Sequence, residues 1–219
     1  MIKTTIVGFG DSLTYGYGVR TKDNYISRLD IFMPSYFPAV CWNVINSGVN
    51  GDTTREGLQR LETDVLRHHP NIVFLLFGTN DSSAIEGQFR PLKEYENNLT
   101  QMVAQIQNHH NQTGLNHCQP IPVLITPPPV LESEAMPFYS NDRILQYVQV
   151  VKDVAKIHHC PVIDFYEYLL TESEGDLASC LQEDGVHLSL TGYDHLFDSV
   201  FSELTKLIDY EGILKDLKI

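Results

Sequence analysis

The stretch TIVGFGDSLTYGYG, residues 5–18, places a serine directly after a short apolar run and two glycines. Glycines that follow a strand can cradle phosphate, whereas a serine at such a point can be the nucleophile of a hydrolase. Far along the chain, Asp184 and His187 lie three positions apart with Gly185 between them. A histidine held by a carboxylate can accept the proton of a serine hydroxyl. Ser12 therefore has two candidate settings, a phosphate-binding turn or the edge of a hydrolytic site.

Three known motifs that place glycine or serine after a strand do not fit this stretch. The dinucleotide fingerprint G-x-G-x-x-G starts at Gly8 but needs glycine at position 13, which is Leu13. A P-loop needs a lysine, and none is present here. The nucleophile elbow G-x-S-x-G needs glycine at position 14, which is Thr14. What remains is Gly-Asp-Ser-Leu at 10–13, where Ser12 taken alone could equally be the N-cap of a helix.

Three further polar blocks follow other apolar runs of the sequence. They are NSGVNGDTT at 46–54, GTND at 78–81 and DGVH at 184–187. In an open parallel sheet, ligands bind beyond the carboxyl ends of the strands, where loops from different strands meet. Each block leaves the predicted sheet at the same edge as Ser12, so we expect all four to meet there.

The strands that must position these blocks are short and apolar. Their β-branched and aromatic residues and near-continuous hydrophobicity are typical of strands buried on both faces. We predict strands at 2–7, 40–46, 71–77, 121–125 and 161–165.

The segments between these runs show the 3.6-residue apolar period of amphipathic helices. Thr53 and Glu56 have the spacing of a capping box, and Pro91 occupies a plausible first helical position. We predict helices over 53–69, 91–110 and 141–158 and after residue 191. Alternating strands and helices imply a parallel sheet with helices on both faces. No repeat, low-complexity tract or linker composition interrupts the pattern, so we expect one α/β domain over 1–219.

The four blocks, in this order, resemble the SGNH (GDSL-type) esterase and lipase superfamily over residues 8–193. The resemblance implies a three-layer α/β/α sandwich, flavodoxin-like, with a five-stranded parallel sheet. It also implies hydrolysis of carboxylic esters or thioesters through an acyl-enzyme, with no cofactor and no metal. The stretch ITPPP at 125–129 is similar to the isoamyl-acetate-hydrolysing esterases. NSGVNGDTT is equally similar to the lysophospholipase and thioesterase branch, so the branch stays open.

Position by position, the resemblance implies a role for each of five residues. Ser12 matches the nucleophile, and Asp184 and His187 match the pair that activates it. Gly51 matches the backbone donor of the oxyanion hole and Asn80 its side-chain donor, with the Ser12 N–H as a third donor. This assignment suits the chemistry, because donors aimed at the tetrahedral oxyanion lower the barrier by about 3–4 kcal/mol each in well-studied enzymes.

Two other functions remain open on the residues alone. Asp11, Asn80, Asp81 and His187 are ligand types that a metal-dependent phosphoesterase would use. A non-enzymatic flavodoxin-like binding module is the other alternative, although it has no use for the pair Asp184 and His187.

The remaining histidines have mainly structural interpretations, and one loop has two interpretations. The pairs at 68–69, 109–110 and 158–159 fall at predicted helix C-termini, where imidazoles bind the last carbonyls. His117 falls in a predicted loop and His195 in the last helix, and neither has a carboxylate three positions before it in a turn. The segment 130–140 follows the fourth strand, and its Met136, Phe138 and Tyr139 either line a substrate pocket or pack on the core.

Charge and composition exclude several partners. The net charge is −13, from 15 basic and 28 acidic residues, which argues against nucleic acid and against a polybasic membrane patch. No stretch approaches the roughly 18 apolar residues of a membrane span, and MIKTTIVGFG lacks the apolar core of a signal peptide. The four cysteines (Cys41, Cys118, Cys160 and Cys180) show no metal-binding spacing and suggest buried free thiols. We expect a cytoplasmic protein that acts on a small-molecule, lipid or sugar ester.

Overall fold

Five parallel strands form the centre of the computed structural model, which describes residues 2–110, 119–134 and 136–209. The strands are β1 (Ile2–Gly10), β2 (Val40–Gly48), β3 (Ile72–Leu76), β4 (Ile121–Ile125) and β5 (Val162–Ile163). They pair in the order β2-β1-β3-β4-β5, and every pair is parallel. This is the strand order of flavodoxin-like folds, whose ligands bind where the order reverses, here between β1 and β3.

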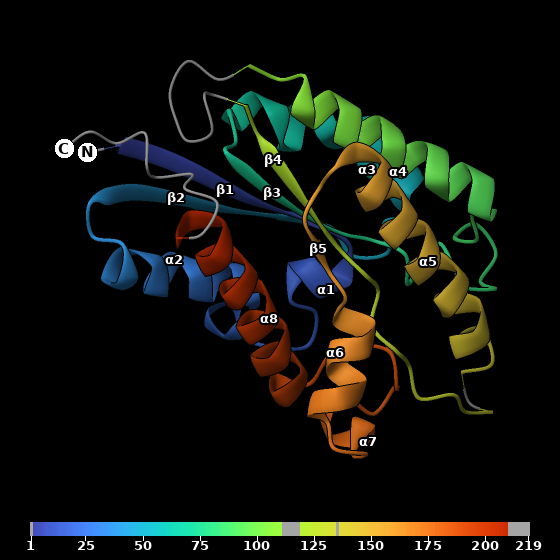
Figure 1. Ribbon diagram of the computed structural model, residues 1–219. Coiled ribbons are helices and arrows are strands. Elements are labelled where there is room, and N and C mark those ends of the chain that lie inside the picture. Colours follow the sequence, from blue (N-terminus) through green and yellow to red (C-terminus); the bar gives the residue numbers. More distant parts are fainter. Residues whose placement is uncertain (1, 111–118, 135, 210–219) are drawn as a thin grey trace.

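Helices cover both faces of the sheet, so the predicted three-layer architecture is confirmed. Figure 1 shows one layer on each side of the strands. The first layer is α2 (Tyr25–Tyr36), α6 (Phe165–Glu172) and α8 (Leu190–Asp209), and the second is α3 (Thr54–Asp64), α4 (Leu92–Gln107) and α5 (Asn141–His158). Shorter elements lie in the connections: α1 (Ser12–Tyr15), α7 (Leu177–Cys180) and the 3₁₀ turns η1 (Thr21–Asp23) and η2 (Leu66–His68).

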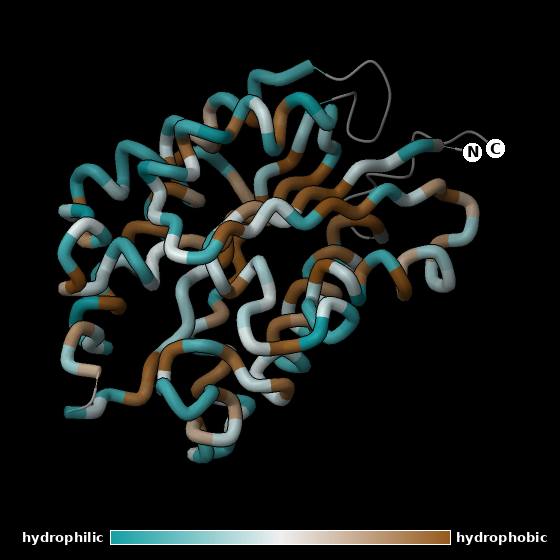
Figure 2. Tube along the Cα trace, turned by 180° about the vertical axis from the view of Figure 1, so that it is seen from behind, coloured by the Kyte–Doolittle hydropathy of each residue, from teal (hydrophilic) through white to brown (hydrophobic). Residues whose placement is uncertain are grey.

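The central strands β3 and β4 are apolar at every position because both of their faces are covered. In β3, Phe74 and Leu76 pack with the layer of α2, α6 and α8, whereas Val73 and Leu75 pack with the layer of α3, α4 and α5. Successive side chains of a strand point to opposite faces, so each layer receives every second residue. Figure 2 shows the resulting hydrophobic centre along the strands and the hydrophilic outer surfaces of the helices.

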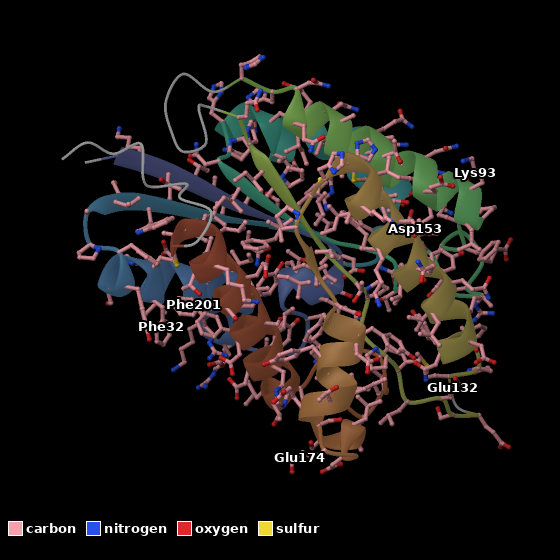
Figure 3. The ribbon with its side chains drawn as sticks, viewed as in Figure 1. Phe32, Lys93, Glu132, Asp153, Glu174 and Phe201 are labelled. Atoms are coloured by element: carbon pink, nitrogen blue, oxygen red, sulfur yellow. The ribbon has the colours of Figure 1, made fainter. Side chains whose placement is uncertain are left out.

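Aromatic side chains join α2 to α8 at the outer edge of their shared layer. Phe32 packs on Phe197 with ring centroids 5.3 Å apart, and Tyr36 meets Phe201 edge-on at 4.8 Å. Phe32 and Phe201 lie near one another at the periphery in Figure 3. These contacts fix α8, whose N-terminal end follows the loop that carries His187.

Two strands are longer than predicted, and two, β3 and β5, are shorter. β1 and β2 continue to the in-register glycines Gly10 and Gly48, because glycines can pair in a sheet although they add no apolar signal. The prediction of strand over 161–165 was wrong at its end. Asp164 caps α6 by accepting from the Glu167 N–H, and Phe165 is the first helical residue.

α5 has its predicted range, whereas α3 and α4 differ from theirs at the ends. Thr53 and Glu56 do form the capping box of α3, but this helix ends at Asp64 rather than continuing to residue 69. His69 takes a left-handed conformation (φ 50°) before Pro70, which disfavours helix at the preceding residue. Pro91 is the residue before the helix and not its first residue, because α4 begins at Leu92.

Among the described residues, the histidine pairs follow their expected positions, whereas the cysteines do so only in part. The prediction of a buried thiol was wrong for Cys41, which is exposed because the outward positions of the edge strand β2 face solvent. Cys160 is half-buried and Cys180 is buried, while Cys118 lies outside the described residues. The three histidine pairs do fall at or just after the ends of η2, α4 and α5, and His117 lies outside the described residues.

Candidate active site

Ser12 is the first residue of α1, directly beyond the carboxyl end of β1. Its neighbour Asp11 is the N-cap of this short helix and accepts the Leu13 N–H at 2.9 Å through Oδ1. The alternative that Ser12 itself is the N-cap is therefore wrong. Its hydroxyl is free of a capping role and lies 3.1 Å from Nε2 of His187.

Close packing explains the glycines at the ends of β1 and β2. A Cβ at Gly10, one of the glycines of the opening stretch, would lie 2.3 Å from the Leu76 carbonyl oxygen. Gly48, in register with Gly10, lies directly against α1. A Cβ at Gly48 would lie 2.1 Å from the backbone nitrogen of Tyr15, far inside van der Waals contact. Glycine at this position lets the helix that carries Ser12 sit on the strand ends, so its role here is steric.

Asp184 and His187 lie on one turn that brings both side chains toward Ser12. Gly185 takes φ +70° in this turn, a conformation that favours glycine. Oδ2 of Asp184 lies 2.6 Å from Nδ1 of His187, and Oδ1 accepts the backbone N–H groups of Val186 and His187, each at 2.9 Å. The carboxylate therefore holds both the imidazole and the turn on which the imidazole stands.

The charge of Asp184 is stabilised by these contacts. Partial burial alone would raise the pKa of Asp184, but hydrogen bonds from the His187 ring and from the His187 and Val186 N–H groups lower it below its ordinary value. The group is therefore an anion near neutral pH. An anionic Asp184 accepts a hydrogen bond from a protonated Nδ1. In a neutral imidazole, this leaves Nε2 unprotonated and facing Ser12.

Gly51 and Asn80 come from the loops after β2 and β3, which are joined through Asp52, the residue after Gly51. Asn80 donates one amide N–H to the carbonyl of Asp52 at 2.8 Å, so its second N–H is left for another acceptor. Gly51 takes φ +81°. Among the described residues, the backbone N–H groups of Ser12 and Gly51 have no hydrogen-bond acceptor. All three predicted oxyanion donors thus retain an unused N–H.

Arg60 of α3 joins the segments that carry Ser12 and Gly51, and no motif or periodicity in the sequence marks it. Its guanidinium binds the Asp52 carboxylate at 2.6 Å, the Ser47 carbonyl at 2.7 Å and the Gly10 carbonyl at 2.9 Å. It also lies over the ring of Phe9, 4.4 Å from the ring centroid. One side chain therefore connects the ends of β1 and β2 to the start of α3.

Asp81 makes a second connection between these loops. Its carboxylate accepts the Thr54 N–H at 3.0 Å and the Thr54 hydroxyl at 2.5 Å, which ties the β3 loop to the N-terminus of α3. The sequence block GTND contains Asp81, but only the fold shows that it binds Thr54.

A family model describing GDSL-like lipases and acylhydrolases matches residues 9–195, which include every residue of this site. The chain belongs to the GDSL-like lipase/acylhydrolase family. It is therefore an enzyme, a serine hydrolase that cleaves carboxylic esters. The predicted superfamily and reaction class are confirmed.

Solved and curated relatives of this acylhydrolase support the same fold and class. A crystal structure of the lipase/acylhydrolase from Enterococcus faecalis is 32% identical, with a TM-score of 0.75, and the match covers 92% of this chain and 95% of that one. The isoamyl acetate-hydrolyzing esterase of Saccharomyces cerevisiae is 25% identical over 92% of this chain and 84% of its own. Thioesterase 1/protease 1/lysophospholipase L1 of Escherichia coli is 22% identical over 95% and 86%. Both predicted branches are thus among the relatives of this acylhydrolase.

The geometry of this acylhydrolase also argues against the metal-dependent alternative. Asn80 is bound to Asp52, Asp81 to Thr54, and His187 lies between Ser12 and Asp184, so each of these side chains is engaged by another residue of the protein. Within residues 2–110, 119–134 and 136–209, no three His, Cys, Asp or Glu side chains form a group suited to a metal. Over the same residues, no helix is long and apolar enough to cross a membrane.

In the acylhydrolase, residues 130–134 and 136–140 contribute a tyrosine and a methionine to a buried cluster. Tyr139 is buried in a cluster with Val130 and Val186, and Met136 packs against that cluster, whereas Phe138 is exposed. The Leu131 N–H donates to the Gly185 carbonyl at 2.8 Å. The segment therefore supports the turn between Asp184 and His187 from behind.

Proposed function

We propose that Ser12 is the nucleophile of this esterase, that His187 is its general base and that Asp184 holds His187. The observation that carries the proposal is the unbroken series of contacts from Ser12 Oγ to His187 Nε2 (3.1 Å) and from His187 Nδ1 to Asp184 Oδ2 (2.6 Å). A serine hydroxyl is a weak nucleophile at neutral pH unless a base lies within hydrogen-bond reach. Here His187 Nε2 lies within hydrogen-bond reach of Ser12 Oγ, and Asp184 binds the other ring nitrogen of His187.

In the first half of the reaction, Ser12 Oγ attacks the ester carbonyl carbon as its proton passes to Nε2 of His187. The imidazolium so formed is stabilised by the anionic Asp184 at Nδ1. When the tetrahedral intermediate collapses, the bond to the alcohol oxygen breaks and His187 returns the proton to that leaving oxygen. The products of this half are a free alcohol and an acyl group esterified to Ser12.

In the second half, a water molecule takes the place of the alcohol. His187 accepts a proton from the water as its oxygen attacks the acyl carbonyl, and then returns the proton to Ser12 Oγ as the acyl-enzyme bond breaks. The products are a carboxylic acid and the free enzyme. The same histidine therefore acts as base and then as acid in each half.

We assign the oxyanion hole to the N–H groups of Ser12 and Gly51 and to the second amide N–H of Asn80. Support comes from the donors themselves, because each has an unused N–H and they lie at the ends of β1, β2 and β3. Donors on fixed backbone cost no reorganisation when negative charge develops on the carbonyl oxygen.

For the biological context, we propose a cytoplasmic, single-domain enzyme that acts on a small-molecule, lipid or sugar ester. Free thiols support a reducing compartment, since Cys41, Cys160 and Cys180 form no disulfide. The acyl chain length and the leaving alcohol or thiol depend on the shape of the pocket around Ser12. A panel of p-nitrophenyl esters from acetate to palmitate, with acetylated sugars and acyl thioesters beside it, measures this preference.

Covalent labelling tests the assignment of the nucleophile. A serine-directed fluorophosphonate should label the wild-type enzyme once, with loss of activity, and peptide mass spectrometry should locate the label on Ser12. Ser12→Ala should take up no label and lose at least about 10³-fold in kcat, because the three residues act as a unit. A matched control is Ser82→Ala, since Ser82 is also buried but its hydroxyl donates to the Thr79 carbonyl. A label on another residue, or near-normal turnover by folded Ser12→Ala, would contradict the assignment.

A further inference from the structure

The ring of Tyr17 lies against the imidazole of His187. The two ring centroids are 4.3 Å apart and the planes are inclined by 35°, so the tyrosine face covers the imidazole face. The Tyr17 side chain is nevertheless 45% exposed, so burial in the core does not account for its position. The inference drawn from this contact rests on the proposed role of His187 as the base.

The backbone of Tyr17 is tied to the nucleophile. Its N–H donates to the carbonyl of Ser12 at 3.0 Å, beyond the C-terminal end of α1. The preceding Gly16 takes φ +94°, which turns the chain back across the end of this helix. The position of the Tyr17 ring is therefore set relative to Ser12 and not only relative to His187.

Gln182 ties the same tyrosine to the His187 loop. Its side-chain amide donates to the Tyr17 carbonyl at 2.9 Å and to the Leu188 carbonyl at 2.8 Å. Its backbone N–H donates to the His187 carbonyl at 2.7 Å. One glutamine thus fixes the distance between two segments that lie 165 residues apart in the sequence.

Asp184 alone does not determine the plane of the imidazole. A hydrogen bond at Nδ1 holds one ring atom, while the χ2 torsion of a histidine is broad and its ring can tilt about that contact. Tilting would move Nε2 away from Ser12 Oγ. An aromatic face packed on the imidazole prevents the tilt on that side, and it does so without adding a polar group to the site.

We propose that Tyr17 is a positioning residue for the base: its ring holds the His187 imidazole in the plane in which Nε2 faces Ser12 and Nδ1 faces Asp184, and Gln182 holds Tyr17 there. The role belongs to the aromatic face and not to the hydroxyl. Since a misplacement of about 1 Å can cost a catalytic contact roughly 10²-fold, partial loss of this restraint should cost about 10-fold in kcat.

Two substitutions at Tyr17 separate the ring from the hydroxyl. Tyr17→Leu should lower kcat about 10-fold and change KM less than about twofold, whereas Tyr17→Phe should keep kcat within about twofold of wild type. The matched control is Tyr36→Leu, which removes an exposed tyrosine that also packs on one aromatic ring, Phe201 at 4.8 Å, in the contact between α2 and α8. Thermal unfolding of all variants separates loss of folded enzyme from loss of rate.

A second readout does not depend on the ester. The second-order rate constant for fluorophosphonate labelling of Ser12 requires His187 but not a bound alcohol, so Tyr17→Leu should lower it in parallel with kcat. Gln182→Met changes neither ring and removes the amide that binds the Tyr17 carbonyl. It should lower the labelling rate in the same direction, which keeps the proposal testable if Tyr17→Leu fails to fold.

The outcomes distinguish this inference from the proposed function. Wild-type kcat and labelling rate in Tyr17→Leu would overturn the positioning role, as would a change in KM alone or an equal loss in Tyr17→Phe. If Tyr17→Leu does not fold, an unchanged labelling rate in Gln182→Met would overturn it. Full activity of His187→Ala would instead overturn the assignment of the base. An inactive His187→Ala beside a fully active Tyr17→Leu would leave that assignment intact and remove only the role of Tyr17.

Discussion

The side-chain amide of Asn80 donates to the backbone carbonyl of Asp52 at 2.8 Å, one residue after Gly51. This bond joins the loop after β3 to the loop after β2 and orients the amide that bears the second N–H. The two non-serine donors of the proposed oxyanion hole are therefore held by one hydrogen bond between their own loops. Placement of both donors before substrate binds is what makes such a site effective.

Asn80→Ala should reduce kcat by roughly 10²–10³ with little change in KM, because the donor acts mainly on the charge of the transition state. Steady-state kinetics on one ester at saturating and subsaturating concentrations checks this. Asn98→Ala is a useful comparison, since Asn98 is also buried but donates to the Thr54 hydroxyl on α3. A rise in KM at constant kcat would mark Asn80 as a substrate-binding residue instead.

Asp184→Asn should lower kcat/KM by up to about 10⁴, by analogy with the serine-protease aspartate. The amide oxygen can still accept the two backbone N–H groups, so the turn should persist, but its NH₂ faces Nδ1 and favours the tautomer with Nε2 protonated. Asp184→Ala should lose less rate, because water can then accept the Nδ1 proton. The decisive measurement is kcat/KM of both variants on one ester at pH 7.5. A lower kcat/KM for Asp184→Ala than for Asp184→Asn would contradict this explanation.

Arg60→Met should destabilise the fold by about 2 kcal/mol and lower kcat, because it leaves the largely buried carboxylate of Asp52 and two carbonyls without their donor. Arg55→Met is the matched control on the same helix. Arg55 pairs with Glu94 in a similar two-point contact, but at a more exposed position, so its loss should cost less than about 1 kcal/mol. Urea unfolding measures the free energy of unfolding of both variants. An equal decrease in the two variants would argue against a special role for Arg60.

Asp11→Asn should change how stability depends on pH. Burial raises the pKa of Asp11 from 3.8 to about 7, so the folded state favours the protonated carboxyl. The contribution of protonated Asp11 to the free energy of unfolding is complete below the pKa of Asp11 in the unfolded chain. It is lost as pH rises through the pKa of Asp11 in the folded protein, with a slope of up to about 1.4 kcal/mol per pH unit. The asparagine cannot titrate, so the variant should lose less stability than wild type between pH 4.5 and 7.5.

Urea unfolding at several pH values across that range tests the prediction for Asp11. Burial also raises the pKa of Asp81 to about 7, so some pH dependence should remain in the variant. A free-energy difference between wild type and Asp11→Asn that stays constant from pH 4.5 to 7.5 would show that Asp11 does not titrate differently in the folded state.

Much of this protein was determined by local sequence. Continuous apolar runs predicted the strands, because both faces of a central parallel strand are buried, and β4 has the predicted bounds. The 3.6-residue period predicted α5 without error over 141–158, since one stripe of that helix faces the sheet. The order of the four polar blocks predicted which loops meet, because parallel strands bring their carboxyl ends to one edge.

Tertiary structure alone decided how the site is held. Arg60, Tyr17 and Gln182 act through backbone carbonyls and ring faces of segments distant in sequence, and such partners leave no motif or periodicity. The misplaced end of the last strand has a local cause, because Asp164 caps α6 by accepting the Glu167 N–H and its apolar neighbours concealed that signal. The sequence by itself therefore determined which residues could do the chemistry and where the strands place them. Their separation and orientation depended on long-range contacts that form only when the chain is packed.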